Sequence, residues 1–210
     1  MRAFIYSGGS IDKSNIHERP AKDDLIIAAD QGYENAKALG VKPSILLGDF
    51  DSLDRSSFDE DGVEIMTVPA EKDFTDTQMA VDVAVKRGAT ELVIIGGLGG
   101  RLDHTLSNLA ILEDMHSKGI RVTINDGYNR VRYIKNDGII ILRSKYKYIS
   151  LLAKGDKVKG VSIEGCKYPL NNATLTERYQ YAVSNEIVGN CTLINVKKGA
   201  LLIVESRDKT

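Results

Sequence analysis

The chain has 210 residues with 28 basic and 29 acidic side chains, a length that suits one large domain or two small ones. Its balanced charge, without a basic run or an interleaved aromatic patch, gives no indication of nucleic acid as a partner. The apolar run at the N-terminus is too short for a signal peptide and no segment approaches the length of a membrane span, so we expect a cytoplasmic protein without a membrane partner.

Up to about residue 125, short apolar runs alternate with helical patterns, which is typical of a mostly parallel sheet covered by helices. Strands are predicted over residues 3–6, 25–29, 45–47, 64–68, 92–95 and 121–124. Helices are predicted over residues 31–39, 74–87 and 103–118. The apolar stripe of the third helix is expected to consist of Leu102, Leu106, Leu109 and Ala110.

Beyond residue 125 the pattern changes to β-type runs punctuated by glycines. Strands are predicted over residues 139–142, 148–153, 157–163, 191–196 and 201–204, with hairpin turns at Lys154-Gly155-Asp156 and Lys198-Gly199. The two cysteines, Cys166 and Cys191, are expected to be free thiols. We therefore expect an α/β domain over residues 1–125, a polar connecting segment over 126–138 and an all-β domain over 139–210.

An acidic pair follows the apolar run Ile45-Leu46-Leu47, which ends at Gly48. Alternate residues of an extended segment point to the same side, so Asp49 and Asp51 should face one point in space. Two close carboxylates are costly without a cation between them, and hard ions such as Mg²⁺ bind carboxylates while keeping positions for phosphates. The pair thus predicts a magnesium and phosphate site, unless it is a turn whose side chains satisfy backbone N–H groups.

Three further acids are predicted near the same edge of the sheet. Asp30 follows the strand over 25–29, where it either caps the next helix or lies in a ligand site, because ligands of open α/β sheets bind outside the carboxyl ends of strands. Asp73 and Asp76 precede or begin the second helix, either as an N-cap with its capping-box partner or as ligands. The adjacent Lys72 favours a site that holds phosphates near both a metal and an ammonium group.

A glycine loop lies between the strand over 92–95 and the third helix. Its glycines, Gly97, Gly99 and Gly100 among them, bring backbone N–H groups close to a ligand, and Arg101 adds a fork of donors. His104 is interpreted as a surface or capping residue of the helix. With no nucleophile constellation in view, the set favours direct, metal-assisted phosphoryl transfer.

These stretches, in this order, resemble the thiamine pyrophosphokinase (thiamine diphosphokinase) family. The resemblance is carried by Ala29-Asp30-Gln31-Gly32, Gly48-Asp49-Phe50-Asp51-Ser52, Lys72-Asp73-Phe74-Thr75-Asp76 and the run from Gly96 to His104. Looser similarity extends to the stretches Gly165–Leu170 and Ser184–Glu186. The fold class that the resemblance implies is a Rossmann-like three-layer α/β domain followed by a C-terminal all-β sandwich.

The resemblance implies transfer of the pyrophosphoryl group of ATP to the hydroxyl of thiamine, with Mg²⁺ as cofactor, in a homodimer that binds thiamine between the α/β domain of one subunit and the β-domain of the other. The implied catalytic residues are Asp49, Asp51, Asp73 and Asp76. The implied metal ligands are Asp49, Asp51 and Asp76. The implied ATP-binding residues are Asp30, Lys72, Gly97, Gly99, Gly100, Arg101, Asp103 and His104. The implied thiamine-binding residues are Asp76, Gln78, Tyr168, Ser184 and Asn185.

One position departs from the family pattern, because Gln78 stands where an acidic residue is frequent, and it is therefore left out of the metal set. Two other functions stay open at this point. A nucleotidyl- or glycosyltransferase could use Asp49 and Asp51 as an Asp-x-Asp metal motif, although this leaves Lys72 and Arg101 unexplained. A non-catalytic thiamine- or nucleotide-binding protein would keep the pockets and need fewer acids.

Overall fold

The computed structural model describes residues 1–48, 62–67 and 74–208. It divides the chain into two compact units, Met1–Gly127 and Tyr128–Thr210, and each unit is described by itself. None of the helices in the described ranges is long and apolar enough to cross a membrane. The cysteines are free thiols as predicted, with Cys166 buried and Cys191 exposed.

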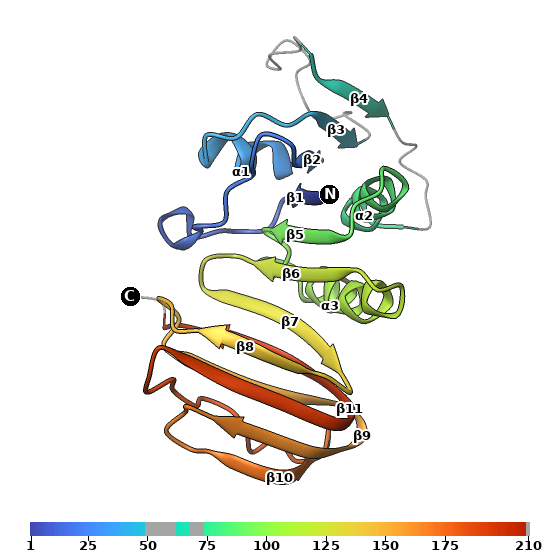
Figure 1. Ribbon diagram of the computed structural model, residues 1–210. Coiled ribbons are helices and arrows are strands. Elements are labelled where there is room, and N and C mark those ends of the chain that lie inside the picture. Colours follow the sequence, from blue (N-terminus) through green and yellow to red (C-terminus); the bar gives the residue numbers. More distant parts are fainter. Residues whose placement is uncertain (49–61, 68–73, 209–210) are drawn as a thin grey trace. The chain divides into compact units, whose positions relative to one another are not determined.

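The first unit is built on a parallel sheet, as predicted (Figure 1). Its strands in the described ranges are β1 (Arg2–Tyr6), β2 (Leu25–Ala29), β3 (Ile45–Gly48), β4 (Glu64–Thr67), β5 (Glu91–Ile95) and β6 (Arg121–Asn125). Neighbouring strands are parallel, and their order across the sheet is β4-β3-β2-β1-β5-β6. The order reverses between β1 and β5, and such a reversal is where open α/β sheets bind ligands.

Helices cover both faces of this sheet, which makes the unit three-layered. Besides a 3₁₀ turn, η1 (Lys13–Asn15), its helices are α1 (Gly32–Ala38), α2 (Asp76–Lys86) and α3 (Leu102–Ser117). Ala36 of α1 packs with Phe4 and Tyr6, which are alternate residues of β1 and so share one face. Figure 1 shows α1 on one side of the sheet and α2 and α3, which contact each other, on the other.

The prediction for the apolar stripe of α3 was wrong. Leu102 is 70% exposed and Leu106 is 59% exposed. The residues that α3 buries are Asn108, Ile111, Leu112 and Met115. This face includes an asparagine because the buried Asn108 amide donates a hydrogen bond to the carbonyl oxygen of Gly97 at 2.8 Å. A stripe chosen by apolarity alone therefore lies on the wrong side of the helix.

The second unit is antiparallel and contains two strands much longer than predicted. Its described strands are β7 (Asn129–Lys135), β8 (Gly138–Leu142), β9 (Tyr148–Glu164), β10 (Leu170–Leu175) and β11 (Cys191–Ser206). Both predicted hairpins were wrong, because their turn residues lie inside β9 and β11. Neither strand turns back at these residues, since β9 and β11 pair with each other in antiparallel fashion on both sides of them. The pairing of β9 with β11 shifts register between Lys198 and Ala200, and Gly155 (φ 87°) and Gly199 (φ 110°) lie at this shift. Their left-handed backbone conformations belong to a bulge-like irregularity that bends the strands.

The bent strands build the two layers of a β-sandwich. Residues 200–206 of β11 pair with β7 and with residues 148–154 of β9, whereas residues 191–195 pair with β8 and residues 158–163 of β9 pair with β10. Leu151 and Leu201 of the first layer share one core cluster with Val161 and Ile194 of the second. The strands β7 and β10 were not predicted, because β7 lies in the segment assigned to a connection and β10 reads Leu-Asn-Asn-Ala-Thr-Leu.

The two units carry opposite net charges that the nearly neutral whole chain conceals. Residues 1–127 contain 13 basic and 22 acidic residues, a net charge of −9. Residues 128–210 contain 15 basic and 7 acidic residues, a net charge of +8. The carboxylates available for a cation are therefore concentrated in the α/β unit.

The contact between α1 and β1 can be tested by adding one methyl group. A Cβ atom at Gly32 would lie 1.9 Å from the carbonyl oxygen of Tyr6. We expect Gly32→Ala to lower the free energy of unfolding by about 1–3 kcal/mol, because the helix must shift away from the strand. Thermal melting should show a lower melting temperature for Gly32→Ala than for the control variant Gly189→Ala. Gly189 is a suitable control because a Cβ there would meet nothing within 4 Å. Equal melting temperatures for the two variants would contradict the tight contact.

Candidate active site

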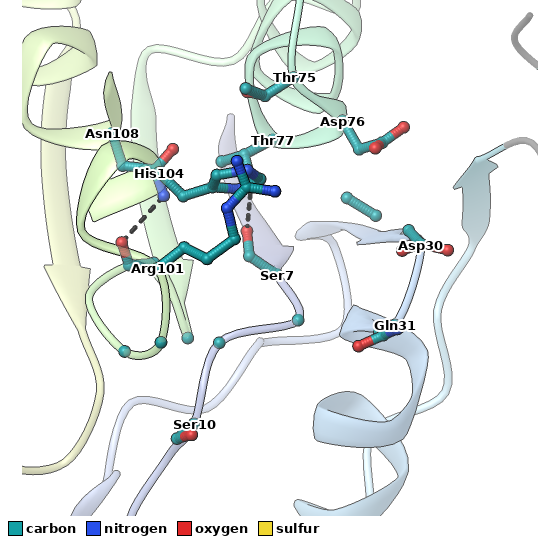
Figure 2. A pocket seen from close by; sticks show the side chains of 17 residues that line it. Ser7, Ser10, Asp30, Gln31, Thr75, Asp76, Thr77, Arg101, His104 and Asn108 are labelled. Atoms are coloured by element: carbon teal, nitrogen blue, oxygen red, sulfur yellow. Dashed lines mark hydrogen bonds between the residues drawn. The ribbon is translucent and has the colours of Figure 1, made fainter. Parts of the chain in front are cut away.

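A pocket of about 410 Å³ lies at the carboxyl ends of β1, β2 and β5, beside the reversal of strand order. It is lined by the loops that follow these strands and by the first turns of α2 and α3 (Figure 2). The lining residues are Ser7, Gly8, Gly9, Ser10, Ala29, Asp30, Gln31, Thr75, Asp76, Thr77, Gly96, Gly97, Gly99, Gly100, Arg101, His104 and Asn108. Its position and volume are typical of small-molecule sites.

The loop after β1, Ser7-Gly8-Gly9-Ser10, was missed by the sequence analysis. The backbone N–H of Ser7 donates to the carbonyl oxygen of Ile95 at 2.8 Å, and that of Gly9 donates to Gly96 at 3.0 Å. A Cβ atom at Gly9 would lie 2.2 Å from the carbonyl oxygen of Gly96, so only glycine fits. A pair of glycines directly after a predicted strand was the one sequence signal that could have indicated this loop.

The loop after β5 contains the predicted glycines and packs against the loop after β1. Gly96 (φ 79°) and Gly100 (φ 94°) adopt the left-handed conformation that favours glycine. A Cβ at Gly99 would lie 2.7 Å from the carbonyl oxygen of Ser10.

Several backbone amides at this pair of loops remain available to a ligand. Within the described part of the chain, the N–H groups of Gly8, Gly97, Gly99 and Gly100 make no hydrogen bond. Successive amides of this kind, together with a helix N-terminus, form a concave binding site for an anion.

The start of α2 differs from the capping alternative. Thr75 is the N-cap, its side chain accepting a hydrogen bond from the backbone N–H of Gln78 at 3.2 Å, whereas the capping alternative had assigned this position to Asp73. Asp76 begins the helix and lines the pocket. The buried hydroxyls of Thr77 and Ser7 are 2.9 Å apart and link α2 to the loop after β1. The Gln78 side chain donates to Asp82 at 3.3 Å, and Gln78 is not among the pocket-lining residues.

Asp30 lies at the pocket in a strained backbone conformation. Its φ of 47° is in the left-handed region, which a residue with a side chain adopts at a cost. Its backbone N–H donates to Leu47 at 2.7 Å and its carbonyl oxygen accepts from Tyr33 at 3.2 Å. The N-cap of α1 is Gln31, without a side-chain cap, so the Asp30 carboxylate does not serve as the helix cap. Figure 2 shows Asp30 and Asp76 on one side of the pocket, opposite Asn108.

Arg101 is the N-cap residue of α3 and pairs with Asp103. Its Nη2 lies 2.5 Å from Asp103 Oδ2 and its Nε lies 3.1 Å from Oδ1. These hydrogen bonds lower the pKa of the exposed Asp103 carboxyl to about 2, so the carboxylate stays ionised at neutral pH. A phosphate ligand would have to share the guanidinium with Asp103. His104 donates its backbone N–H to Asp103 at 2.9 Å, and it also lines the pocket.

Four predicted site residues, Asp49, Asp51, Lys72 and Asp73, lie outside the described residues. No group of three acidic, histidine or cysteine side chains that could hold a metal occurs within the described ranges. The described part of the pocket nevertheless contributes the carboxylates of Asp30 and Asp76, the donor type that hard ions take. A Cβ atom at Gly48, the last residue of β3, would lie 3.4 Å from Asp30 Cα.

The predicted thiamine-side residues of the second unit lie close together. Asn185 is buried, and its Oδ1 accepts from the backbone N–H of Tyr168 at 3.0 Å and of Glu186 at 2.9 Å. Its Nδ2 donates to the carbonyl oxygen of Tyr168 at 2.7 Å. Asn185 thus fastens the loop that presents the Tyr168 ring, which is 60% exposed. Ser184 is exposed and has a φ of 57°.

Similar proteins match both units of the chain. Residues 17–124 match the family model described as "Thiamin pyrophosphokinase, catalytic domain", and residues 137–201 match "Thiamin pyrophosphokinase, vitamin B1 binding domain". The thiamine pyrophosphokinase of Bacillus subtilis (strain 168) is 29% identical over 188 residues, which is 88% of this chain and 88% of that protein.

Solved structures agree with these matches. The crystal structure of thiamine pyrophosphokinase from Bacillus subtilis has a TM-score of 0.88 at 25% identity and covers 100% of both chains. That of thiamin pyrophosphokinase from Geobacillus thermodenitrificans has a TM-score of 0.85 at 26% identity, covering 100% of this chain and 99% of the other. With the catalytic-domain model matching more than half of its length, this chain belongs to the thiamin pyrophosphokinase family.

Proposed function

We propose that the protein transfers the pyrophosphoryl group of ATP to the hydroxyl group of thiamine, giving thiamine diphosphate and AMP. The observation that carries this proposal is the pocket at the strand-order reversal, where N–H groups of two glycine loops, without a partner among the described residues, and the carboxylates of Asp30 and Asp76 line one cavity. An anion cradle facing carboxylates suits a polyphosphate accompanied by a cation. Family membership then supplies the acceptor, thiamine.

The ATP phosphates would be held on the side of the glycine loops. Backbone N–H groups of Gly97, Gly99 and Gly100 are the donors there, and Arg101 adds a charged fork at the start of α3. Lys72, with Asp103 and His104 beside Arg101, completes the proposed ATP set. Held in this way, the β-phosphorus would form a bond to the hydroxyl oxygen of thiamine as its bond to the oxygen bridging to the α-phosphate breaks, and AMP would leave.

Carboxylate oxygens from the same pocket would hold Mg²⁺. We propose Asp49, Asp51 and Asp76 as the residues that hold it, with Asp73 close to the reacting groups and Asp30 beside them. When bound, Mg²⁺ would neutralise part of the phosphate charge. The donor set fits this ion because Asp30 and Asp76 line the pocket with carboxylates, the ligands that hard ions take.

Thiamine would be recognised by parts of both kinds of domain. The thiazolium ring of thiamine is cationic, and the β-unit itself has a net charge of +8. Carboxylates of an α/β unit would therefore neutralise the positive charge of the ring. Asp76 is the proposed partner, with Gln78 near it. The exposed ring of Tyr168, held by Asn185, offers a face for stacking next to Ser184.

We further propose that the active form is a homodimer in which one subunit's β-domain completes the other's thiamine site. The opposite net charges of the two units favour the approach of unlike units from two chains. The apolar side chains Leu102 and Leu106 on α3, which begins at the pocket, are exposed and would gain from being covered.

The function is tested by following AMP formation. Purified protein with ATP, Mg²⁺ and thiamine should release AMP and thiamine diphosphate in equal amounts, and release should stop without thiamine. Chelation by EDTA should abolish turnover and added Mg²⁺ should restore it, because carboxylates alone cannot hold the phosphates. Release of ADP, or thiamine-independent nucleotide hydrolysis, would refute the proposal, and binding without turnover would indicate a non-catalytic binding protein.

The orientation of the pocket is tested with Arg101→Ala. We expect ATP affinity measured by calorimetry to fall about tenfold or more, since a charge-assisted donor to phosphate is lost, while thiamine affinity is unchanged. Arg121→Ala is the matched control, because Arg121 is also an exposed arginine paired with an acid, Glu91, and is not among the pocket-lining residues. Loss of thiamine binding with unchanged ATP binding would place the loop against the other substrate.

The shared site is tested by complementation between two inactive variants. One subunit carries Asp51→Asn, and the other carries Tyr168→Ala with Ser184→Ala, which spares the buried Asn185. In mixed dimers one of the two sites would combine an unaltered α/β domain with an unaltered β-domain, so part of the activity should return. Absence of recovery after demonstrated subunit exchange would place the whole site within one chain.

A further inference from the structure

Asn35 of α1 binds two carbonyl groups of the loop after β1. Its Nδ2 donates to the carbonyl oxygen of Ser7 at 2.6 Å and to that of Gly9 at 2.8 Å. Since both partners are acceptors, the amino end of the amide must face them, which settles the orientation of the side chain. One side chain therefore fixes two alternate peptide groups of a loop that lines the pocket.

The fold gives Asn35 this reach because α1 lies unusually close to β1. Gly32, the first residue of α1, has no side chain to separate the helix from the carbonyl oxygen of Tyr6, from which a Cβ would be only 1.9 Å away. Asn35 follows three residues later, on the same side of the helix, and so faces the residues that come directly after Tyr6.

The amide of Asn35 also lies where the two glycine loops meet. A Cβ atom at Gly96 would lie 2.5 Å from the carbonyl oxygen of Ser7, 2.8 Å from Asn35 Nδ2 and 3.0 Å from the carbonyl oxygen of Gly9. The N–H of Gly9 in turn donates to the carbonyl oxygen of Gly96. A change at Asn35 would therefore be felt by the loop after β1 and by the start of the loop after β5.

The two bonds determine the direction of two backbone donors. In a trans peptide the carbonyl and the next residue's N–H point in opposite directions, and the described chain has no cis peptide bond. With the carbonyls of Ser7 and Gly9 drawn to Asn35, the N–H groups of Gly8 and Ser10 point away from it. Neither N–H makes a hydrogen bond with any described residue, and both residues line the pocket. The same bonds keep two carbonyl oxygens from facing an anion.

We propose that Asn35 is the positioning residue of the polyphosphate site. It touches no substrate, but it sets the Ser7–Gly8 and Gly9–Ser10 peptide groups so that their N–H groups receive the phosphates of ATP, a role that rests on the proposed function. The ligand class that these donors take is a polyphosphate chain, and they contribute nothing to recognition of the adenosine.

The test uses Asn35→Leu, which keeps the approximate shape of the side chain and removes the donor. Asn15→Leu is the matched control, because Asn15 is a buried asparagine of the same unit whose Nδ2 also donates two hydrogen bonds, to Asp12 and Ser14, and it is not among the pocket-lining residues. Calorimetry with ATP, inorganic tripolyphosphate and AMP is combined with thermal melting of each variant.

We expect Asn35→Leu to weaken ATP and tripolyphosphate binding about tenfold or more, AMP binding by less than about twofold, and thiamine binding not at all. Asn15→Leu should lower the melting temperature to a similar extent without changing any of these affinities. If Asn35→Leu does not fold, Asn35→Ser, with one shorter donor, should show the same order of losses.

Unchanged tripolyphosphate affinity in folded Asn35→Leu would overturn the positioning role, as would an equal loss for AMP and ATP. Failure of the unaltered protein to bind ATP or tripolyphosphate would overturn the proposed function and this role together. A polyphosphate defect in Asn35→Leu without thiamine-dependent AMP release by the unaltered protein would support the positioning role and reject only the thiamine reaction.

Discussion

The candidate site depends on direct contact between two backbone loops at the place where the strand order reverses. The chain leaves β1 toward β2 and leaves β5 toward β6, in opposite directions across the sheet, so the two loops part beyond their contact and leave a crevice. Their contact excludes side chains, since a Cβ at Gly9 would lie 2.2 Å from the carbonyl oxygen of Gly96. Gly99 combines packing with an available donor, since a Cβ there would lie 2.7 Å from the carbonyl oxygen of Ser10 and its N–H makes no hydrogen bond with a described residue.

Most of the α/β unit could be predicted from its sequence because its strands, apart from the exposed β4, are largely buried. Such strands are nearly continuous apolar runs, and their ends place Asp30, Asp76 and Arg101 at one edge. The loop after β1 could not be identified in this way, because Ser-Gly-Gly-Ser carries no charge and matches no fingerprint. Its importance comes from contacts with Asn35 and with Gly96, which only the folded chain reveals.

The β-unit shows where local patterns fail for a physical reason. A glycine with positive φ satisfies a hairpin turn and a bulge equally well, so Gly155 and Gly199 cannot distinguish them. Pairing between strands determines which of the two forms, because β9 and β11 remain hydrogen-bonded to each other on both sides of the irregularity. In the same way, Asn108 belongs to the buried face of α3 because its acceptor is the carbonyl oxygen of Gly97, in the loop that folds back against the helix it precedes.

The charge of the α/β unit sets a condition on how the proposed site can hold ATP. The unit has a net charge of −9, and ATP is itself an anion, so the overall field opposes binding. At physiological ionic strength this field is screened over about 8 Å, whereas donors in contact with the phosphates are not. Binding must therefore come from local groups: the loop amides, Arg101 and the proposed cation held by the carboxylates. The proposed cation, placed between the carboxylates and the phosphates, would make the acidic excess compatible with an anionic substrate.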